Sequence, residues 1–183
     1  AGSGPVCLVP SPGWGYPVGY LYESLKPLEK YFTMVYYDTR ISGKSTGPDD
    51  PAKYTSTDFM KDMDSLRVYL NQPKVWLLGH SDGGYQVFYY AVHHNDKLNG
   101  MIALDPRVGS DSLYMAEFMK DLEARRRFAP KLVDYFLGRD TTKYPIEEIM
   151  KMGMPLYFHD TSKVTLMPHS INTVLSQKAW DYT

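Results

Sequence analysis

The chain has 183 residues, a formal net charge of −1, and a content of 43% hydrophobic and 22% charged residues. This length suits one folded domain with its own core and room for an insertion, and the composition is ordinary for a globular protein. The densest basic run is the three arginines 125–127, so a nucleic-acid partner is not expected. No apolar run reaches the ~18 residues of a membrane span. We therefore expect a soluble protein of unknown compartment, with the cytoplasm slightly favoured.

The two ends of the chain suggest cuts through a longer polypeptide. The sequence begins Ala-Gly-Ser-Gly without an initiator methionine or a signal-peptide pattern, and residues 179–183 show no pattern typical of the end of a domain. The single cysteine, Cys7, has no internal disulfide partner and falls in a predicted buried strand, so we interpret it as a small core residue.

The first part of the chain predicts strand, loop, helix and strand. Residues 5–9 form a buried apolar run, and prolines and glycines keep residues 10–15 out of regular structure. Residues 20–31 carry leucines at helical spacing, with Pro27 expected to kink or shorten the helix. Residues 32–37 are β-branched and aromatic, which favours a second strand.

The alternation of strand and helix then continues. Continuous apolar runs, rather than alternating ones, indicate a parallel sheet covered on both faces. The predicted elements are a helix from Ser56 or Thr57 to about Leu70, a strand at 75–78, a helix at 82–94 and a strand at 98–104 that ends at Asp105.

From about Gly109 the apolar strands stop and helical spacing takes over. The sequence therefore predicts an α/β core over residues 1–108 and an all-helical cap over residues 109–183, inserted after the strand that ends near Asp105. The expected cap helices cover residues 113–124, 130–137, 146–152 and 170–180.

The most informative stretch is the apolar run 75–78 followed by Gly-His-Ser-Asp-Gly, a G-x-S-x-G pattern between a strand and a helix. Such a tight turn forces Ser81 into a strained conformation and lifts its hydroxyl above the sheet, and glycines at 79 and 83 avoid collisions. The N–H of Asp82 at the helix start then faces the space above Ser81. The alternative is a Gly/Ser-rich turn without chemistry.

Three further motifs carry a resemblance to the α/β hydrolases, and specifically to their proline iminopeptidase-like branch. That branch typically has H-G-G-P-G, D-Q-R-G-x-G-x-S and T-x-x-D-x-x-x-D-x-x-x-L-R segments before the G-x-S-x-G turn, which is called the nucleophile elbow. Here Val-Pro-Ser-Pro-Gly stands at 9–13, Asp-Thr-Arg-Ile-Ser-Gly-Lys-Ser at 38–45, and an approximate version of the third at 56–67. The resemblance covers about residues 5–106.

The resemblance implies a serine hydrolase that cleaves an ester, amide or N-terminal peptide bond through an acyl-enzyme on Ser81, with a small-molecule or peptide substrate and no metal or cofactor. A proline iminopeptidase-like aminopeptidase is the leading specific interpretation. Asp82 stands where iminopeptidases more often have tryptophan, which keeps an esterase or lactonase open. A non-catalytic, hydrolase-like ligand-binding protein is the alternative from another class.

The first loop is expected to supply the second oxyanion donor. Ser11 aligns with the usual donor, and its neighbours on both sides are prolines without an N–H, so its own N–H is the only donor in that triplet. Gly13 and Trp14 are next in line and are also candidates for the substrate pocket. In the cap, Glu147 is a candidate ligand for a substrate amine and Tyr157 a candidate pocket residue.

The catalytic acid and histidine of an α/β hydrolase normally follow strands beyond the cap, and no such strands are predicted here. None of the five histidines is expected to be the base, and His80 is expected to pack beside the elbow. Asp105 is a weak candidate acid, with a strand-end turn as the alternative. We expect a second chain or a segment C-terminal to Thr183 to complete the core, docking near Ile102.

Overall fold

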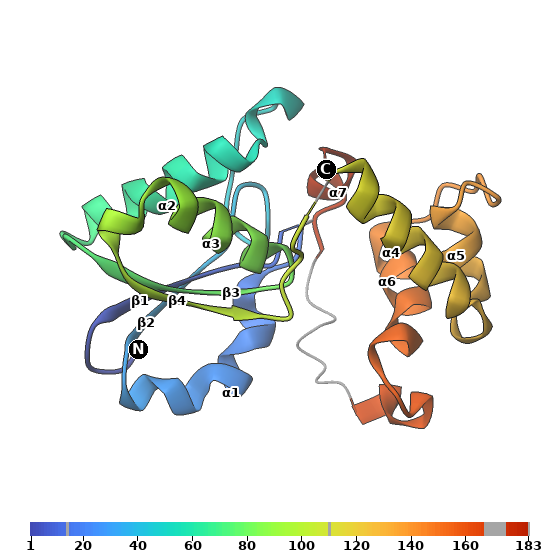
Figure 1. Ribbon diagram of the computed structural model, residues 1–183, viewed down its shortest axis with the longest axis horizontal. Helices are drawn as coiled ribbons and strands as arrows, with labels where there is room; N and C mark the ends of the chain where they lie inside the picture. Colours follow the sequence, from blue (N-terminus) through green and yellow to red (C-terminus); the bar gives the residue numbers. More distant parts are fainter. Residues whose placement is uncertain (14, 110, 167–174, 183) are drawn as a thin grey trace. The chain divides into compact units, whose positions relative to one another are not determined.

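The computed structural model describes residues 1–13, 15–109, 111–166 and 175–182, and these fall into two compact units (Figure 1). The first unit contains Ala1–Val108 together with the described residues 175–182, and the second contains residues 111–166. No helix among the described residues is long and apolar enough to cross a membrane.

The first unit is built on a four-stranded parallel sheet in the order β2-β1-β3-β4. The strands are β1 (Val6–Pro10), β2 (Thr33–Tyr37), β3 (Val75–His80) and β4 (Leu98–Leu104). The predicted parallel sheet is therefore confirmed, and each strand lies within one residue or two of its expected bounds.

Helices cover both faces of this sheet, with α2 (Ser56–Tyr69) and α3 (Asp82–His93) on one face and α1 (Tyr22–Leu25) on the other (Figure 1). The segment around α1 is a short α-helix between two 3₁₀ turns, Val18–Leu21 and Lys26–Lys30, because Pro27 at the start of the second turn prevents a continuous helix.

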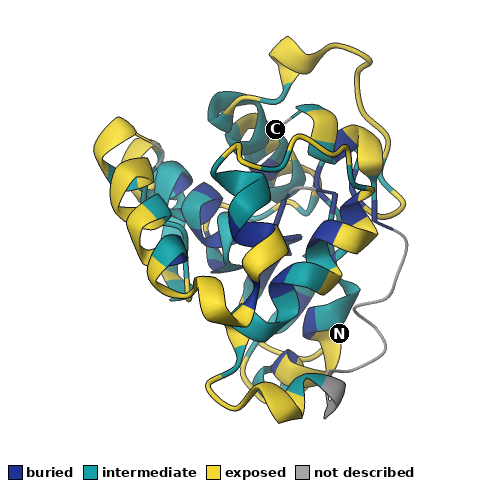
Figure 2. Ribbon diagram, turned by 90° about the vertical axis from the view of Figure 1, so that its right-hand side faces the viewer, coloured by how far each residue is buried: buried dark blue, intermediate teal, exposed yellow. Residues whose placement is uncertain are grey.

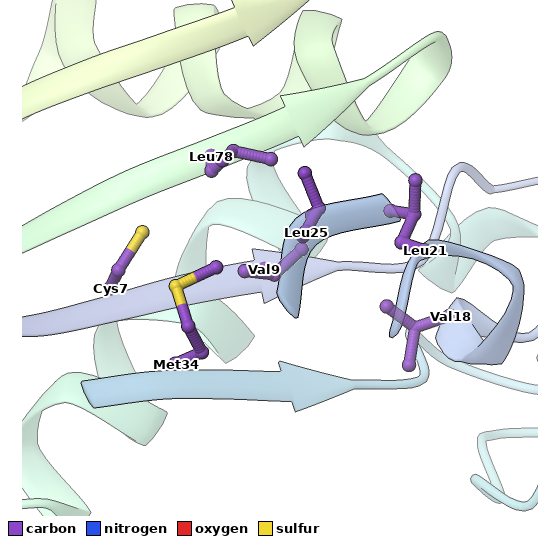
Figure 3. Close-up of a cluster of buried hydrophobic side chains, with 7 residues drawn as sticks. All are labelled: Cys7, Val9, Val18, Leu21, Leu25, Met34 and Leu78. Atoms are coloured by element: carbon purple, nitrogen blue, oxygen red, sulfur yellow. The ribbon is translucent and has the colours of Figure 1, made fainter. Parts of the chain in front are cut away.

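Each face of the sheet has its own buried cluster, as expected for continuously apolar strands. On the α1 side the buried residues are Cys7, Val9, Val18, Leu21, Leu25, Met34 and Leu78 (Figure 3). On the other side they are Leu8, Met63, Val75, Leu77, Val87 and Tyr90. Burial raises the pKa of the Cys7 thiol to about 12, which keeps it protonated and unreactive, in agreement with a core role.

The cap of the α2 helix lies one residue earlier than the sequence suggested. It is Thr55, whose hydroxyl accepts from the Asp58 N–H at 3.2 Å while the Asp58 carboxylate accepts from the Thr55 N–H. This reciprocal pair satisfies two N–H groups that a helix start leaves open. Ser56 and Thr57, the expected caps, are instead the first helical residues.

The loop after β2 is held by two charged side chains. The Asp38 carboxylate accepts from the Val18 N–H at 2.7 Å and from the Lys44 N–H at 3.0 Å. The Arg40 guanidinium forms two hydrogen bonds to the Asp62 carboxylate and donates to the Lys53 carbonyl at 2.6 Å. Asp38 thus connects this loop to the turn at Val18, and Arg40 connects it to the α2 helix through Asp62.

The second unit is helical, with α4 (Ser112–Ala124), α5 (Pro130–Phe136) and α6 (Ile146–Gly153). Each of these helices carries both buried and exposed residues (Figure 2). The α4 helix begins at a capping Asp111, whose carboxylate accepts from the Tyr114 N–H at 2.9 Å. The buried residues in the described part of the unit are Leu122, Ala129, Leu132, Val133, Ile146, Ile149 and Gly153.

The last helix, α7 (Gln177–Tyr182), belongs to the first unit, which differs from the boundary expected for residues 109–183. The Ser176 N–H donates to the Gly15 carbonyl at 3.1 Å, and Lys178 and the Tyr182 hydroxyl both reach the Asp49 carboxylate at 2.6 Å. Residues 167–174, part of the helix expected at 170–180, lie outside the described residues.

Replacing Arg40 tests the role of the β2 loop. Arg40→Gln is expected to lower the free energy of unfolding by about 1–2 kcal/mol, since it leaves a carboxylate and a carbonyl unpaired, and Asp62 is still 42% exposed. Urea unfolding measures the change. The control Lys120→Gln removes an ion pair to Glu117 that is largely in solvent and should cost less than about 0.5 kcal/mol. A changed substrate preference with unchanged unfolding would contradict a structural role.

Candidate active site

Ser81 is the single residue between the end of β3 and the start of α3, and it adopts φ 56° and ψ −124°. A positive φ is unfavourable for a residue with a side chain and costs about 1–3 kcal/mol, so the surrounding structure must impose it. This is the strained strand-to-helix turn that the sequence predicts. The Ser81 side chain is neither sealed in the core nor fully exposed.

The glycines around Ser81 are required by close contacts. A Cβ atom on Gly79 would lie 2.2 Å from the Gly83 carbonyl oxygen, and one on Gly84 would lie 2.6 Å from the Pro106 Cβ. Neither distance is compatible with a side chain. The tightness of the turn thus explains Gly79, whereas a Cβ atom on Gly83 would lie 3.0 Å from the Ser11 carbonyl oxygen in the loop after β1.

The loop that follows β4 fixes the Ser81 peptide from the other side. The Ser81 N–H donates to the Leu104 carbonyl at 3.2 Å, and the Arg107 N–H donates to the Ser81 carbonyl at 3.0 Å. In the same loop Asp105 has a φ of 41°, a second left-handed residue with a side chain. The elbow is therefore held between two neighbouring strand ends, a contact between distant residues that the sequence motif did not indicate.

The Asp82 side chain lies in a network beside the elbow. Its Oδ1 atom accepts from Arg107 Nε at 2.7 Å and Nη2 at 2.5 Å, and its Oδ2 atom accepts from Gln86 Nε2 at 3.2 Å. The Arg107 guanidinium also lies 4.0 Å from the centroid of the Tyr85 ring. Asp82 is thus an ion-paired carboxylate with only 14% of its side chain exposed.

The expected role of the Ser11 N–H as oxyanion donor is wrong. That N–H donates to the Tyr37 carbonyl at 2.9 Å, and the Ser11 hydroxyl bonds to Thr39 Oγ1 at 2.8 Å in a fully buried position. The reason is that the hydrogen bonding of β1 to β2 continues one residue past the strand, through Ser11. The first loop N–H group that is not used in this pairing therefore lies beyond Ser11.

Gly13 is the next donor available in the described part of this loop, because Pro12 has no N–H. Gly13 has a φ of 79°, and an added Cβ would lie 2.7 Å from Asp82 Oδ2, so the loop passes directly against the residue after Ser81. Trp14, the other candidate in this loop, lies outside the described residues.

His80 packs next to the elbow, as expected. Its Nδ1 is hydrogen-bonded to the Tyr20 hydroxyl, and the two rings meet edge to face with centroids 5.6 Å apart. Burial lowers the pKa of His80 below its ordinary value of 6.5, and the negative charge of Asp105 opposes this shift. Asp105 itself is exposed at the end of β4.

The other histidines lie in different places. His93 and His94 stand at the far end of the 12-residue α3, about 17 Å from its first turn at 1.5 Å per residue, so neither reaches Ser81. His159 lies in the second unit, and His169 lies outside the described residues. Among the described residues of the first unit, no histidine forms a hydrogen bond to the Ser81 hydroxyl.

The predicted cap residues lie in the second unit, which is described by itself. Glu147 is in the first turn of α6, and Tyr157 is 71% exposed at the end of a 3₁₀ turn, Met154–Tyr157. Their role in a substrate pocket stays a prediction. Among the described residues no group of three or more histidine, cysteine or acidic side chains is placed to hold a metal ion.

Comparison with known proteins agrees with this geometry. The family model of the alpha/beta hydrolase fold matches residues 9–172, and the chain belongs to that family. A proline iminopeptidase of Lactobacillus helveticus is 34% identical over 86 residues, which are 46% of this chain and 29% of that enzyme. The matched segment thus spans less than a third of the length of this relative.

Two solved structures show the same fold. A proline iminopeptidase-related protein from Thermus thermophilus is 26% identical with a TM-score of 0.58, over 84% of this chain and 50% of that one. An esterase from Exiguobacterium antarcticum is 17% identical with a TM-score of 0.64, over 100% of this chain and 65% of that one. The similarity to the esterase, at 17% sequence identity, shows only that the two chains share a fold.

The buried imidazole of His80 predicts a pH dependence of stability. The folded state resists protonation of His80, whose pKa is lowered, while the unfolded chain takes up a proton near pH 6.5, so stability should fall as the pH drops below that value. Thermal unfolding at pH about 7.5 and 5.5 measures this. His80→Gln keeps a hydrogen-bond acceptor for Tyr20 without a titrating ring and should reduce the pH slope. Equal slopes for both proteins would contradict the assignment.

Proposed function

We propose that this chain carries the nucleophile and part of the oxyanion site of a serine hydrolase, with Ser81 as the nucleophile. The observation that carries the proposal is the left-handed conformation of Ser81 between a buried strand and the first turn of α3. That conformation stores strain at one serine, and strained residues of this kind concentrate at functional sites.

In the proposed reaction the Ser81 hydroxyl attacks a substrate carbonyl carbon and passes its proton to a base. The carbonyl oxygen becomes an oxyanion, which the N–H of Asp82 and the positive end of the α3 dipole stabilise, with Gly13 as the candidate second donor. Collapse of this intermediate expels the leaving group, which takes the proton, and water then releases the acyl group from Ser81.

The second unit is proposed as a cap that shapes the substrate pocket. Glu147 lies in the first turn of α6, and no ion pair occupies it among the described residues, whereas Glu123 is paired with Arg139 at 2.7 Å. An N-terminal amine of a peptide is a substrate group that a free glutamate would bind. This supports an aminopeptidase resembling the proline iminopeptidases, as does the 34% identity with the Lactobacillus enzyme.

An esterase acting on small molecules is the second candidate. Asp82 occupies the position where the iminopeptidases more often carry tryptophan, and its ion pair with Arg107 makes the surroundings of the elbow more polar than an indole would. A chromogenic prolyl anilide and an aryl ester, tested side by side, separate these two activities.

The complete active molecule is proposed to contain additional strands beside β4. In the described sheet β4 pairs only with β3, and unpaired apolar edges promote association. The missing strands would carry the acid and the histidine that the described first unit does not place at Ser81. The coverage of 50% and 65% of the two solved relatives supports this proposal.

A fluorophosphonate probe tests the nucleophile in the complete molecule. We expect a covalent adduct on Ser81, located by mass spectrometry of the digested protein, because only an activated serine displaces fluoride from the probe. Ser81→Ala should abolish labelling and turnover without loss of fold. The control Ser65→Ala, an exposed serine on α2, should label like the wild type. A folded complete protein without an adduct would favour the non-catalytic binding protein instead.

The additional strands are tested by the native mass of the purified active protein. We expect an active species heavier than 21.0 kDa, with a strand paired to β4 around Ile102 and a histidine within about 3 Å of the Ser81 hydroxyl. A 21.0 kDa monomer that hydrolyses esters through Ser81 would contradict this expectation. One of the five histidines of this chain would then have to be the base.

A further inference from the structure

The residue that donates the proposed oxyanion N–H is itself negatively charged. Asp82 immediately follows Ser81, and 14% of its side chain is exposed, so solvent screens its carboxylate only in part. The tetrahedral intermediate on Ser81 would place a second negative charge close to this carboxylate. Two like charges at such a distance in a partly buried site repel each other, which would oppose catalysis.

Arg107 is placed to remove this penalty. Its guanidinium holds the carboxylate through Nε at 2.7 Å and Nη2 at 2.5 Å, both to Oδ1, and lies over Tyr85 at 4.0 Å from the ring centroid. Its backbone N–H donates to the Ser81 carbonyl at 3.0 Å. A single residue of the β4 loop thus contacts both the nucleophile and the residue that donates to the oxyanion.

The rest of the network has a feature that stability alone does not explain. Gln86 turns its Nε2 atom to Asp82 Oδ2 at 3.2 Å, and its own Oε1 atom is buried without a partner among the described residues. Leaving a buried acceptor unpaired is unfavourable. The carboxylate is therefore kept in one orientation at a cost in stability.

We propose that Arg107 is a positioning residue that neutralises the Asp82 carboxylate and fixes the elbow, so that the oxyanion forms beside a compensated charge. This inference rests on the proposed hydrolase function. It also explains how the chain accommodates aspartate after the nucleophile.

The first prediction of this inference is a rescue. Arg107→Gln leaves the Asp82 charge uncompensated and should slow labelling of Ser81 by the fluorophosphonate, and turnover of a neutral ester, on the order of tenfold or more. Because the uncompensated charge of Asp82 causes this loss of rate, adding Asp82→Asn in the same chain should restore both rates to within a few-fold of the wild type. The loss should fall on kcat rather than on KM, because a neutral substrate gains charge only in the transition state.

A matched control comes from an ion pair elsewhere in the same unit. Arg67 Nε donates to Asp64 Oδ1 at 2.8 Å, and both pairs are partly buried: 11% of the Arg67 and 24% of the Asp64 side chain are exposed, against 24% for Arg107 and 14% for Asp82. Arg67→Gln should lower the melting temperature to a similar degree while leaving the labelling rate of Ser81 unchanged.

The outcomes separate this inference from the function on which it rests. An unlabelled wild-type protein would overturn both. A labelled wild type in which the double variant stays as slow as Arg107→Gln would overturn the neutralising role alone, as would an Arg67→Gln variant that loses labelling equally. Restored labelling in the double variant, with a melting temperature that stays low, would support the inference, because a purely structural role predicts that labelling recovers only together with the melting temperature.

Discussion

The structure of this site depends on one constrained peptide, that of Ser81. Its N–H and carbonyl are bound by Leu104 and Arg107, and its φ of 56° is accessible only because glycines clear the space around it. The two hydrogen bonds require the parallel pairing of β3 with β4. The two buried clusters that fix the sheet therefore also hold the serine in a conformation that it would not adopt by itself.

The sheet and the elbow were predictable from the sequence because their signals are local. Continuous apolar runs specify buried parallel strands, and a serine between spaced glycines specifies the turn. The position of the loop donor was not predictable in this way. The prolines beside Ser11 indicate the end of a strand, yet hydrogen bonding to Tyr37 continues through Ser11, because Ser11 keeps its own N–H although both neighbouring prolines lack one.

The contacts that sequence reasoning missed all join distant segments. Arg107 follows β4 by three residues and has no motif around it, and its pairing with Asp82 depends on the two strand ends lying side by side. The α7 helix likewise has the composition of the preceding helices, and its long-range contacts, such as those with Asp49 and Tyr54, place it in the first unit. Local pattern predicts such a helix but not the surface that it covers.

In the serine hydrolase that we propose, the described residues of the first unit would stabilise negative charge, and the proton transfer would fall to other residues. This division has a physical basis. Backbone N–H groups, a helix dipole and an ion pair are fixed by the sheet itself, so they are preorganised before any substrate binds. A base must instead reach the serine hydroxyl from outside the turn, since the residues within the elbow are used to hold it: His80 is bound to Tyr20, and Asp82 is bound to Arg107. In this proposal, the tightness that makes Ser81 a nucleophile candidate is thus also the reason why its base would come from another strand end.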